Sequence, residues 1–189
     1  MSVDPRVKEL LASGDVAGAA TAALRELGPT ILRYLRSLLR DEADARDAFS
    51  QFAENLWKGL PEFRAESSLR TWAFRLAWHA ALNVRDEAWR RRRQRLATGD
   101  ASRLADEIRT RTAVRVERQK KALDVLREAL SVEDRSLLVL RIDQGLAWND
   151  IAEVLGAEGK AVEVAALMKR FERLKDRLAR MAREQGLVE

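Results

Sequence analysis

The sequence contains no cysteine and a single histidine, His79. Without cysteine the chain can form neither disulfides nor thiolate metal sites, and this composition is compatible with a reducing cytosol. One imidazole is too few to assemble a zinc site from histidine and cysteine ligands. No P-loop or dinucleotide-binding glycine pattern is present either. We therefore predict no metal site, no cofactor and no enzymatic activity.

Long apolar runs are also lacking. No stretch approaches the roughly 20 apolar residues that a membrane span needs. The first residues, MSVDPRVKE, are charged and do not contain the apolar core of a secretory signal. These absences predict a cytoplasmic protein with no membrane insertion of its own.

Proline is rare, with three residues in 189, and no strand-type alternation of apolar and polar residues occurs. Apolar residues instead recur at the three-four spacing of amphipathic helices, which predicts an all-α fold. Capping and breaking residues predict the helix limits. The first expected helix begins at Asp4 and Pro5, and a second runs from Asp15 to near Gly28. A third begins at Pro29, and the pattern continues over Asp44–Leu60. A further helix runs from Ser67 or Ser68 to about Arg95.

Turn-forming residues near Gly99 predict a boundary between two small helical domains. We expect a first domain at 1–96, a flexible or partly helical connector at 97–118, and a second domain at 119–189. In the second domain, Ser131 and Asp134 resemble a capping box that opens a helix.

Positive charge is concentrated in two blocks. Residues 58–95 carry 10 basic and 4 acidic groups, whereas residues 1–57 carry 7 and 9. A second block, Lys169 to Arg183, has seven basic groups against Glu172 and Asp176. Two separate blocks favour two contacts with a polyanion, although solvated helix faces would give the same pattern.

The segment Gly145–Leu178 is typical of a helix-turn-helix. A short helix from Trp148 to Leu155 precedes Gly156 and a longer helix, which is expected to begin near Ala161. In such units the first turns of the second helix enter the major groove. Here they offer only Glu163 as a polar side chain, so we expect little discrimination among bases.

Aromatic residues make up only 6% of the chain, yet five of the eleven lie within Phe63–Arg93. They lie beside the polar loop Arg64–Ser68 and along the basic helix that is expected to follow it. Aromatic faces beside positive charge form a platform for unpaired bases, with stacking worth roughly 1–3 kcal/mol per base. The simpler interpretation is that rings such as Trp72 and Phe74 belong to the core.

Three stretches together resemble the bacterial sigma factors of the extracytoplasmic-function type. DEADARDAFSQFAENLW (Asp41–Trp57) is similar to the second-region helix that docks on the clamp helices of RNA polymerase. PEFRAESSLRTWAFRLAWHAALN (Pro61–Asn83) resembles the loop and helix that capture the non-template strand of the minus-ten element. LSVEDRSLLVLRIDQGLAWNDIAEVLG (Leu130–Gly156) resembles the fourth-region helix-turn-helix.

The resemblance implies a promoter-specificity subunit for a stress or envelope regulon. It implies binding to the clamp helices and flap of core polymerase, to single-stranded minus-ten DNA and to duplex minus-thirty-five DNA, together with an anti-sigma factor partner. The residues implied for polymerase docking are Asp44, Asp47, Gln51, Asn55 and Trp57. Those for the minus-ten strand are Phe63, Arg64, Glu66, Ser67, Ser68, Arg70, Thr71, Trp72, Arg75, His79, Asn83, Arg90 and Arg91. Those for the minus-thirty-five duplex are Trp148, Asn149, Lys160, Glu163, Lys169, Arg170 and Arg173.

Two alternatives remain open at the level of sequence. The helix-turn-helix segment alone would suit an autonomous DNA-binding repressor. The apolar residues Val162, Val164, Ala165 and Leu167 would suit a protein-interaction module that does not act through polymerase.

Overall fold

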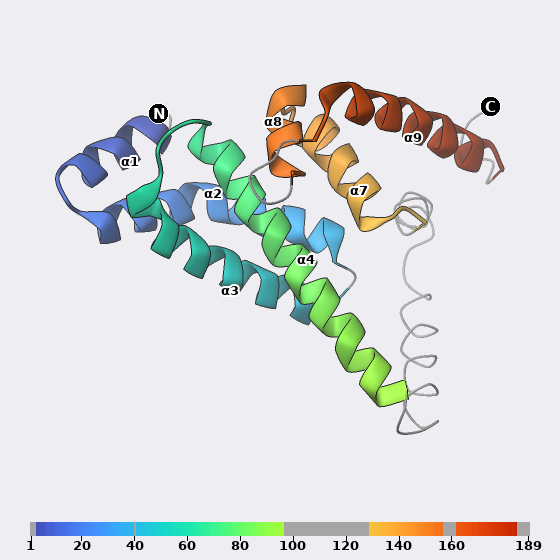
Figure 1. Ribbon diagram of the computed structural model, residues 1–189, viewed down its shortest axis with the longest axis horizontal. Coiled ribbons are helices and arrows are strands. Elements are labelled where there is room, and N and C mark those ends of the chain that lie inside the picture. The colour runs from blue at the N-terminus through green and yellow to red at the C-terminus, as the bar shows by residue number, and fades with distance from the viewer. Residues whose placement is uncertain (1–2, 40, 97–128, 157–161, 185–189) are drawn as a thin grey trace.

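The computed structural model describes residues 3–39, 41–96, 129–156 and 162–184, with side chains from residue 5 onward except at 91–96. Throughout these ranges the chain forms helices and turns and no strand (Figure 1). The predicted all-α class is therefore confirmed. The connector predicted at 97–118 lies outside the described residues.

The N-terminal unit consists of four helices and one short turn. They are α1 (Val3–Ala12), α2 (Val16–Leu38), α3 (Glu42–Gly59), the 3-10 turn η1 (Leu60–Glu62) and α4 (Leu69–Leu96). Asp15 accepts a hydrogen bond from the amide of Gly18 at 2.8 Å, and Ser68 accepts one from the amide of Thr71 at 3.0 Å. Short polar side chains thus satisfy otherwise unpaired amides at two helix starts, as the sequence predicted.

α2 is one continuous helix, so the predicted break between Gly28 and Pro29 is wrong. Proline has no amide hydrogen for the carbonyl of Arg25, a loss that usually breaks or kinks a helix. Packing outweighs that loss because apolar residues before and after the proline share one buried face. The large ones are Leu27, Ile31, Tyr34, Leu35 and Leu38.

Replacing Pro29 by alanine is expected to raise the free energy of unfolding by about 1–3 kcal/mol. Pro29 is exposed, so alanine meets no clash and restores an amide donor. Urea denaturation followed by circular dichroism measures the change, and Thr30→Ala, at the neighbouring position, is the control. A lower free energy in Pro29→Ala would show that α2 needs the geometry that the proline imposes.

The C-terminal unit contains α7 (Val132–Leu138), the π-helical segment η2 (Val139–Asp143), α8 (Trp148–Val154) and α9 (Val164–Glu184). The Ser131 hydroxyl accepts from the amide of Asp134 at 3.1 Å, which confirms one half of the predicted capping box. The Asp134 carboxylate accepts from Arg170 of α9 at 2.6 Å. The second helix of the helix-turn-helix begins at Val164, three residues later than predicted, and residues 157–161 lie outside the described ranges.

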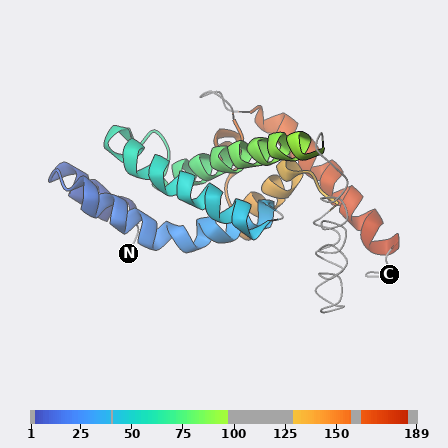
Figure 2. The same ribbon diagram turned by 90° about the horizontal axis from the view of Figure 1, so that it is seen from below.

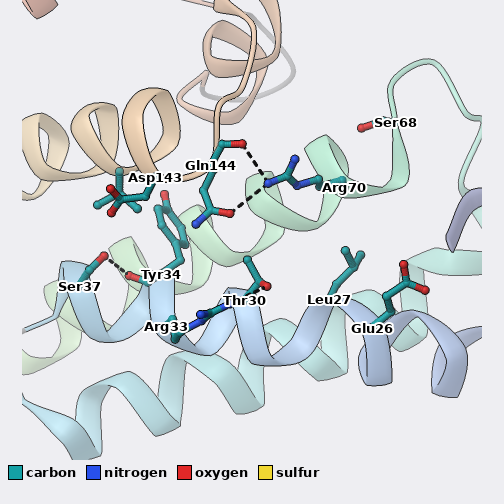
Figure 3. A pocket seen from close by; sticks show the side chains of 11 residues that line it. Glu26, Leu27, Thr30, Arg33, Tyr34, Ser37, Ser68, Arg70, Asp143 and Gln144 are labelled. Carbon is teal, nitrogen blue, oxygen red and sulfur yellow. Dashed lines mark hydrogen bonds between the residues drawn. The ribbon is translucent and has the colours of Figure 1, made fainter. Parts of the chain in front are cut away.

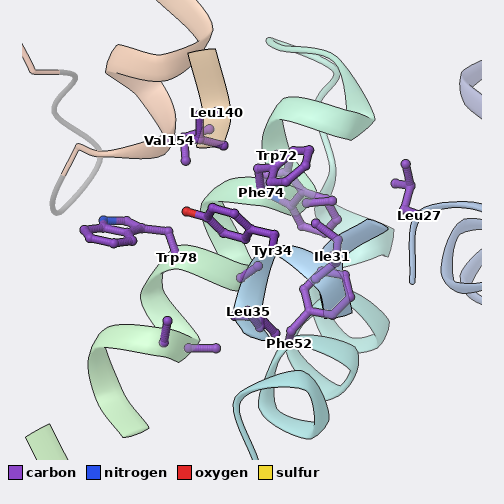
Figure 4. Close-up of a cluster of buried hydrophobic side chains, with 14 of the residues drawn as sticks. Leu27, Ile31, Tyr34, Leu35, Phe52, Trp72, Phe74, Trp78, Leu140 and Val154 are labelled. Atoms are coloured by element: carbon purple, nitrogen blue, oxygen red, sulfur yellow. The ribbon is translucent and has the colours of Figure 1, made fainter. Parts of the chain in front are cut away.

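The two units pack against each other and share one buried cluster. α8 lies against α4, and α7 lies against α2. Figure 4 shows Tyr34, Phe74 and Trp78 of the N-terminal unit facing Leu140 and Val154 of the C-terminal unit. Figure 2 shows α9 extending beyond the helices of the N-terminal unit. The division predicted from the sequence therefore separates two halves that are in contact.

Two buried polar contacts cross the boundary between the units. The hydroxyls of Tyr34 and Ser136 lie 2.6 Å apart, and both residues are buried. The guanidinium of Arg135 donates to the carbonyl of Leu38 at 2.8 Å and to that of Ser37 at 3.3 Å, near the end of α2. Burial raises the pKa of Tyr34 above its ordinary value, so its hydroxyl stays protonated.

Candidate nucleic-acid interface

The loop from Phe63 to Ser68 joins η1 to α4 and carries an unusual backbone conformation. Ala65 has φ of 56°, in the left-handed region that residues with a Cβ rarely adopt. Such strain persists only where the surroundings enforce it, and it often marks functional loops. A cavity of about 360 Å³ lies along this loop, lined in part by Arg64, Glu66 and Arg75. The loop is therefore a shaped surface beside the start of α4.

Trp72 lies beneath this loop. Its ring centroid is 5.1 Å from that of Phe63, and a Cβ at Gly59 would lie 3.1 Å from the indole. The side chain is 8% exposed and packs against the loop, so little of its surface is accessible to a base.

Phe74 and Trp78 belong to the core, at 1% and 4% exposed. The aromatic cluster of the sequence is thus mostly core, and the simpler of the two interpretations holds for these rings. Phe63 is the partly exposed ring within the loop, and Trp89 is 60% exposed further along α4.

Polar and basic residues follow one stripe of α4. Arg75, His79 and Asn83 are four residues apart, which places them on one face of the helix. Arg90 lies farther along and, with Asn83, lines a groove of about 360 Å³. Gln51, Glu54 and Asn55 of α3 line the opposite side of this groove. The structure therefore brings predicted strand-path residues and predicted docking residues together. The side chain of Arg91 is not described.

The beginning of the stripe is covered by the C-terminal unit. Ser67 donates to Glu153 at 2.7 Å and Thr71 donates to Asp150 at 3.1 Å. Arg75 forms an ion pair with Glu153 at 3.3 Å. Sequence reasoning missed both carboxylates. The available signal was their i, i+3 spacing on the short helix α8, but that spacing does not reveal what the helix faces.

His79 is half-buried one turn from Arg75. Burial, and then the positive charge of Arg75, lower the pKa of the imidazole below its ordinary value. The unfolded chain consequently binds this proton more readily than the folded chain, so the group removes stability as pH falls below about 6.5.

Lowering the pH from about 7.5 to about 5.5 is expected to decrease the free energy of unfolding of the wild type more than that of His79→Gln. Urea titrations of both proteins at each pH give the comparison. Carboxylates titrate equally in both, so an identical pH dependence would contradict the assignment.

The residues predicted to dock on polymerase lie on α3. Asp47 and Asn55 are exposed, Asp44 and Gln51 are half-exposed, and these four share one stripe. Trp57 is 44% exposed but lies on another face of the helix, because each residue advances about 100° around the axis. The structure thus brings four of the five together.

In the helix-turn-helix, the predicted duplex-contacting residues divide into two groups. Trp148 and Arg170 are engaged within the unit: the Arg141 guanidinium lies 4.8 Å from the centroid of Trp148, and Arg170 pairs with Asp134. The exposed residues are Asn149, Glu163, Lys169 and Arg173. Lys160 lies outside the described residues. The exposed cations of α9 are therefore available for phosphate contacts.

Among the described residues, no cluster of acidic and histidine side chains could hold a metal ion, and no helix could cross a membrane.

Solved structures share this arrangement of helices. The structure of CnrH in complex with the cytosolic domain of CnrY has a TM-score of 0.64 at 21% identity, covering 97% of this chain and 99% of that one. The sigma factor RpoE, crystallised with the anti-sigma factor NepR from Bartonella quintana, has a TM-score of 0.53 at 20% identity, covering 85% and 94%. The chain therefore shares its all-α fold with these two proteins.

Sequence comparison adds a matching domain and a relative. Residues 23–95 match the family model described as Sigma-70 region 2. RNA polymerase sigma factor YlaC of Bacillus subtilis (strain 168) is 28% identical over 168 residues, which cover 86% of this chain and 94% of that protein. The chain therefore carries a sigma-70 region 2 domain at residues 23–95 and is homologous to RNA polymerase sigma factor YlaC. Sigma factors are transcription regulators rather than enzymes.

Proposed function

We propose that the protein is a promoter-specificity subunit that binds core RNA polymerase, captures the non-template minus-ten strand and starts transcription. One observation carries the proposal: the region 2 match covers α3, the 63–68 loop and α4 as a single block. These elements hold the exposed docking stripe and the strained loop. A cytoplasmic location and an anti-sigma factor partner belong to the same proposal, the latter supported by the complex of RpoE with the anti-sigma factor NepR.

Each unit has a part in this function. The exposed stripe of α3 contacts polymerase, and the 63–68 loop receives an unstacked base over Phe63. Arg70, Arg75, Asn83 and Arg90 follow the backbone of the strand. Unstacking costs a few kcal/mol per base, which a base pocket and phosphate contacts can offset. Melted DNA is then trapped by binding, without nucleotide hydrolysis.

The C-terminal unit would contact the minus-thirty-five duplex through Asn149 and Glu163 and through the exposed cations Lys169 and Arg173. Its affinity comes mainly from phosphates, so it falls with added salt. An autonomous repressor would use the same α9 surface. It would shift duplex DNA in a gel without polymerase, whereas the proposed subunit needs polymerase for tight binding.

The test is transcription from genomic DNA fragments by core polymerase, with and without the purified protein. We expect discrete transcript starts, and thymines upstream of them that become reactive to permanganate, only when both proteins are present. Starts and reactivity no greater than with core polymerase alone would overturn the proposal.

A further inference from the structure

The rotation of α9 about its own axis is fixed by three buried side chains. Leu167, Phe171 and Leu174 are buried, and α9 packs against α7 and α8. The rings of Trp148 and Phe171 meet edge to face, with their centroids 5.5 Å apart. Because the buried residues recur every three or four positions, they occupy one side of the helix, and the opposite side faces solvent.

The solvent-facing side of the first two turns of α9 is small and apolar. Ala165 and Ala166 are exposed, and Met168 is 46% exposed. We call these three residues the apolar patch. Lys169 lies one turn after Ala165, Arg173 lies one turn after Lys169, and both cations are exposed. The helix therefore presents methyl and thioether groups first and positive charges behind them.

Three arginines around the helix-turn-helix are held within the chain. Arg141 lies over an indole ring of the C-terminal unit, and Arg170 forms an ion pair there. Figure 3 shows Arg70 of α4 donating to the backbone carbonyl and side-chain oxygen of Gln144, at 3.0 and 3.1 Å. At the start of α9, Glu163 is then the polar side chain left for hydrogen bonding, and a carboxylate only accepts. The usual guanidinium contact with guanine is therefore not available from the first turns of this helix.

The apolar patch matches one chemical group of the DNA major groove. The groove admits an α-helix, and the 5-methyl group of thymine is the apolar feature that it presents, for which alanine is a usual contact. Side chains as short as alanine also let the helix approach the floor of the groove. Lys169 and Arg173 on the same side suit the phosphates that border it. A protein partner would cover the apolar patch as well, but charged residues are depleted at the centre of protein interfaces.

We propose that α9 selects duplex DNA by the 5-methyl groups of thymine, which contact Ala165, Ala166 and Met168. Lys169 and Arg173 bind the neighbouring phosphates. This inference rests on the part of the proposed function that assigns duplex DNA to α9, and it adds the chemical group that is read. Removing one methyl group from the contact weakens binding about fourfold, and removing two weakens it about fifteenfold.

The test uses duplexes enriched from a random-sequence pool by the full-length protein, both free and bound to core polymerase. Thymines of the enriched duplexes are replaced one at a time by deoxyuridine, which lacks only the 5-methyl group, and affinity is measured by competition. We expect recurrent thymines at which uracil weakens binding about three- to fivefold. In the triple variant Ala165→Ser, Ala166→Ser, Met168→Ser, thymine and uracil duplexes should bind within about twofold of each other at these positions. Each ratio is taken within one protein, so a general loss of affinity in the variant cancels.

Ile142→Ser is the matched control. Ile142 is 62% exposed on η2, outside α9, so the same apolar-to-serine change should leave the thymine preference within about twofold of wild type. A control that loses the preference as fully as the triple variant would overturn the inference.

Three other results would overturn the inference: no enriched duplex, no effect of uracil at any position, or the same effect in wild type and in the triple variant. If uracil has no effect and the triple variant loses polymerase, the apolar patch binds protein instead. Transcription by the wild-type protein with core polymerase is scored separately. If transcription succeeds without a thymine preference, the inference fails and the proposed function stands. If the free protein shows the preference but supports no transcription, the proposed function fails alone.

Discussion

Replacing Arg64 and Glu66 together by alanine is expected to slow open-complex formation by about thirty- to a thousandfold. Both residues are exposed on the strained 63–68 loop and line its cavity. Neither forms a hydrogen bond or ion pair with another residue in the described part of the chain. If Arg64 donates to a phosphate and Glu66 accepts from an N–H group of the flipped base, each contact being worth about 1–2 kcal/mol, the combined loss gives this range.

The measurement is the rate at which thymines near the start site become reactive to permanganate after the holoenzyme is added. Arg25→Ala with Glu26→Ala, at exposed positions of α2, is the matched control and should change the rate by less than about twofold. The free energy of unfolding of the loop variant should stay within about 0.5 kcal/mol of wild type, because exposed side chains are removed. Normal opening by the loop variant would show that the loop does not capture DNA.

Replacing Arg135 by methionine is expected to lower the free energy of unfolding by about 2–4 kcal/mol. The residue is 4% exposed, and its guanidinium donates to the carbonyls of Ser37, Leu38 and Leu130. Carbonyls near a helix end have no partner within the helix, and leaving a buried acceptor unpaired costs about 1–3 kcal/mol. For a chain of this size, the loss corresponds to a fall in melting temperature of roughly 5–15 °C.

Arg85→Met is the control for this experiment. Arg85 also links the two units, through Glu133, but the two side chains are 38% and 37% exposed. An ion pair with this exposure is worth at most about 1 kcal/mol, so the melting temperature should fall by no more than a few degrees. Equal melting temperatures for Arg135→Met and Arg85→Met would refute the role assigned to the buried guanidinium.

Local sequence signals predicted much of the secondary structure. The caps at Asp15 and Ser68 and the apolar spacing act within a few residues, so the sequence alone identifies them. The break predicted at Pro29 failed because packing against other helices overrides the preference of one residue. Whether Trp72 faced solvent or core depended on the same long-range packing, and the sequence pattern allowed both interpretations.

Contacts between the units were beyond prediction from local patterns. Thr71 and Asp150 are 79 residues apart, and nothing in the spacing of either indicates the other. The predicted minus-ten residues Ser67, Thr71 and Arg75 were identified through the family resemblance, which concerns DNA rather than α8. The fold was needed to show that the same side chains already have acceptors within the chain.

The cluster that joins Tyr34, Trp78, Leu140 and Val154 makes the stability of the contact between the two units depend on temperature. Separating the units exposes this apolar surface to water, and exposure of apolar surface carries a positive heat capacity change. Apolar association weakens on cooling as well as at high temperature, so the contact between the two units is expected to be weaker in the cold. Cold lability of this contact is thus a consequence of its apolar composition.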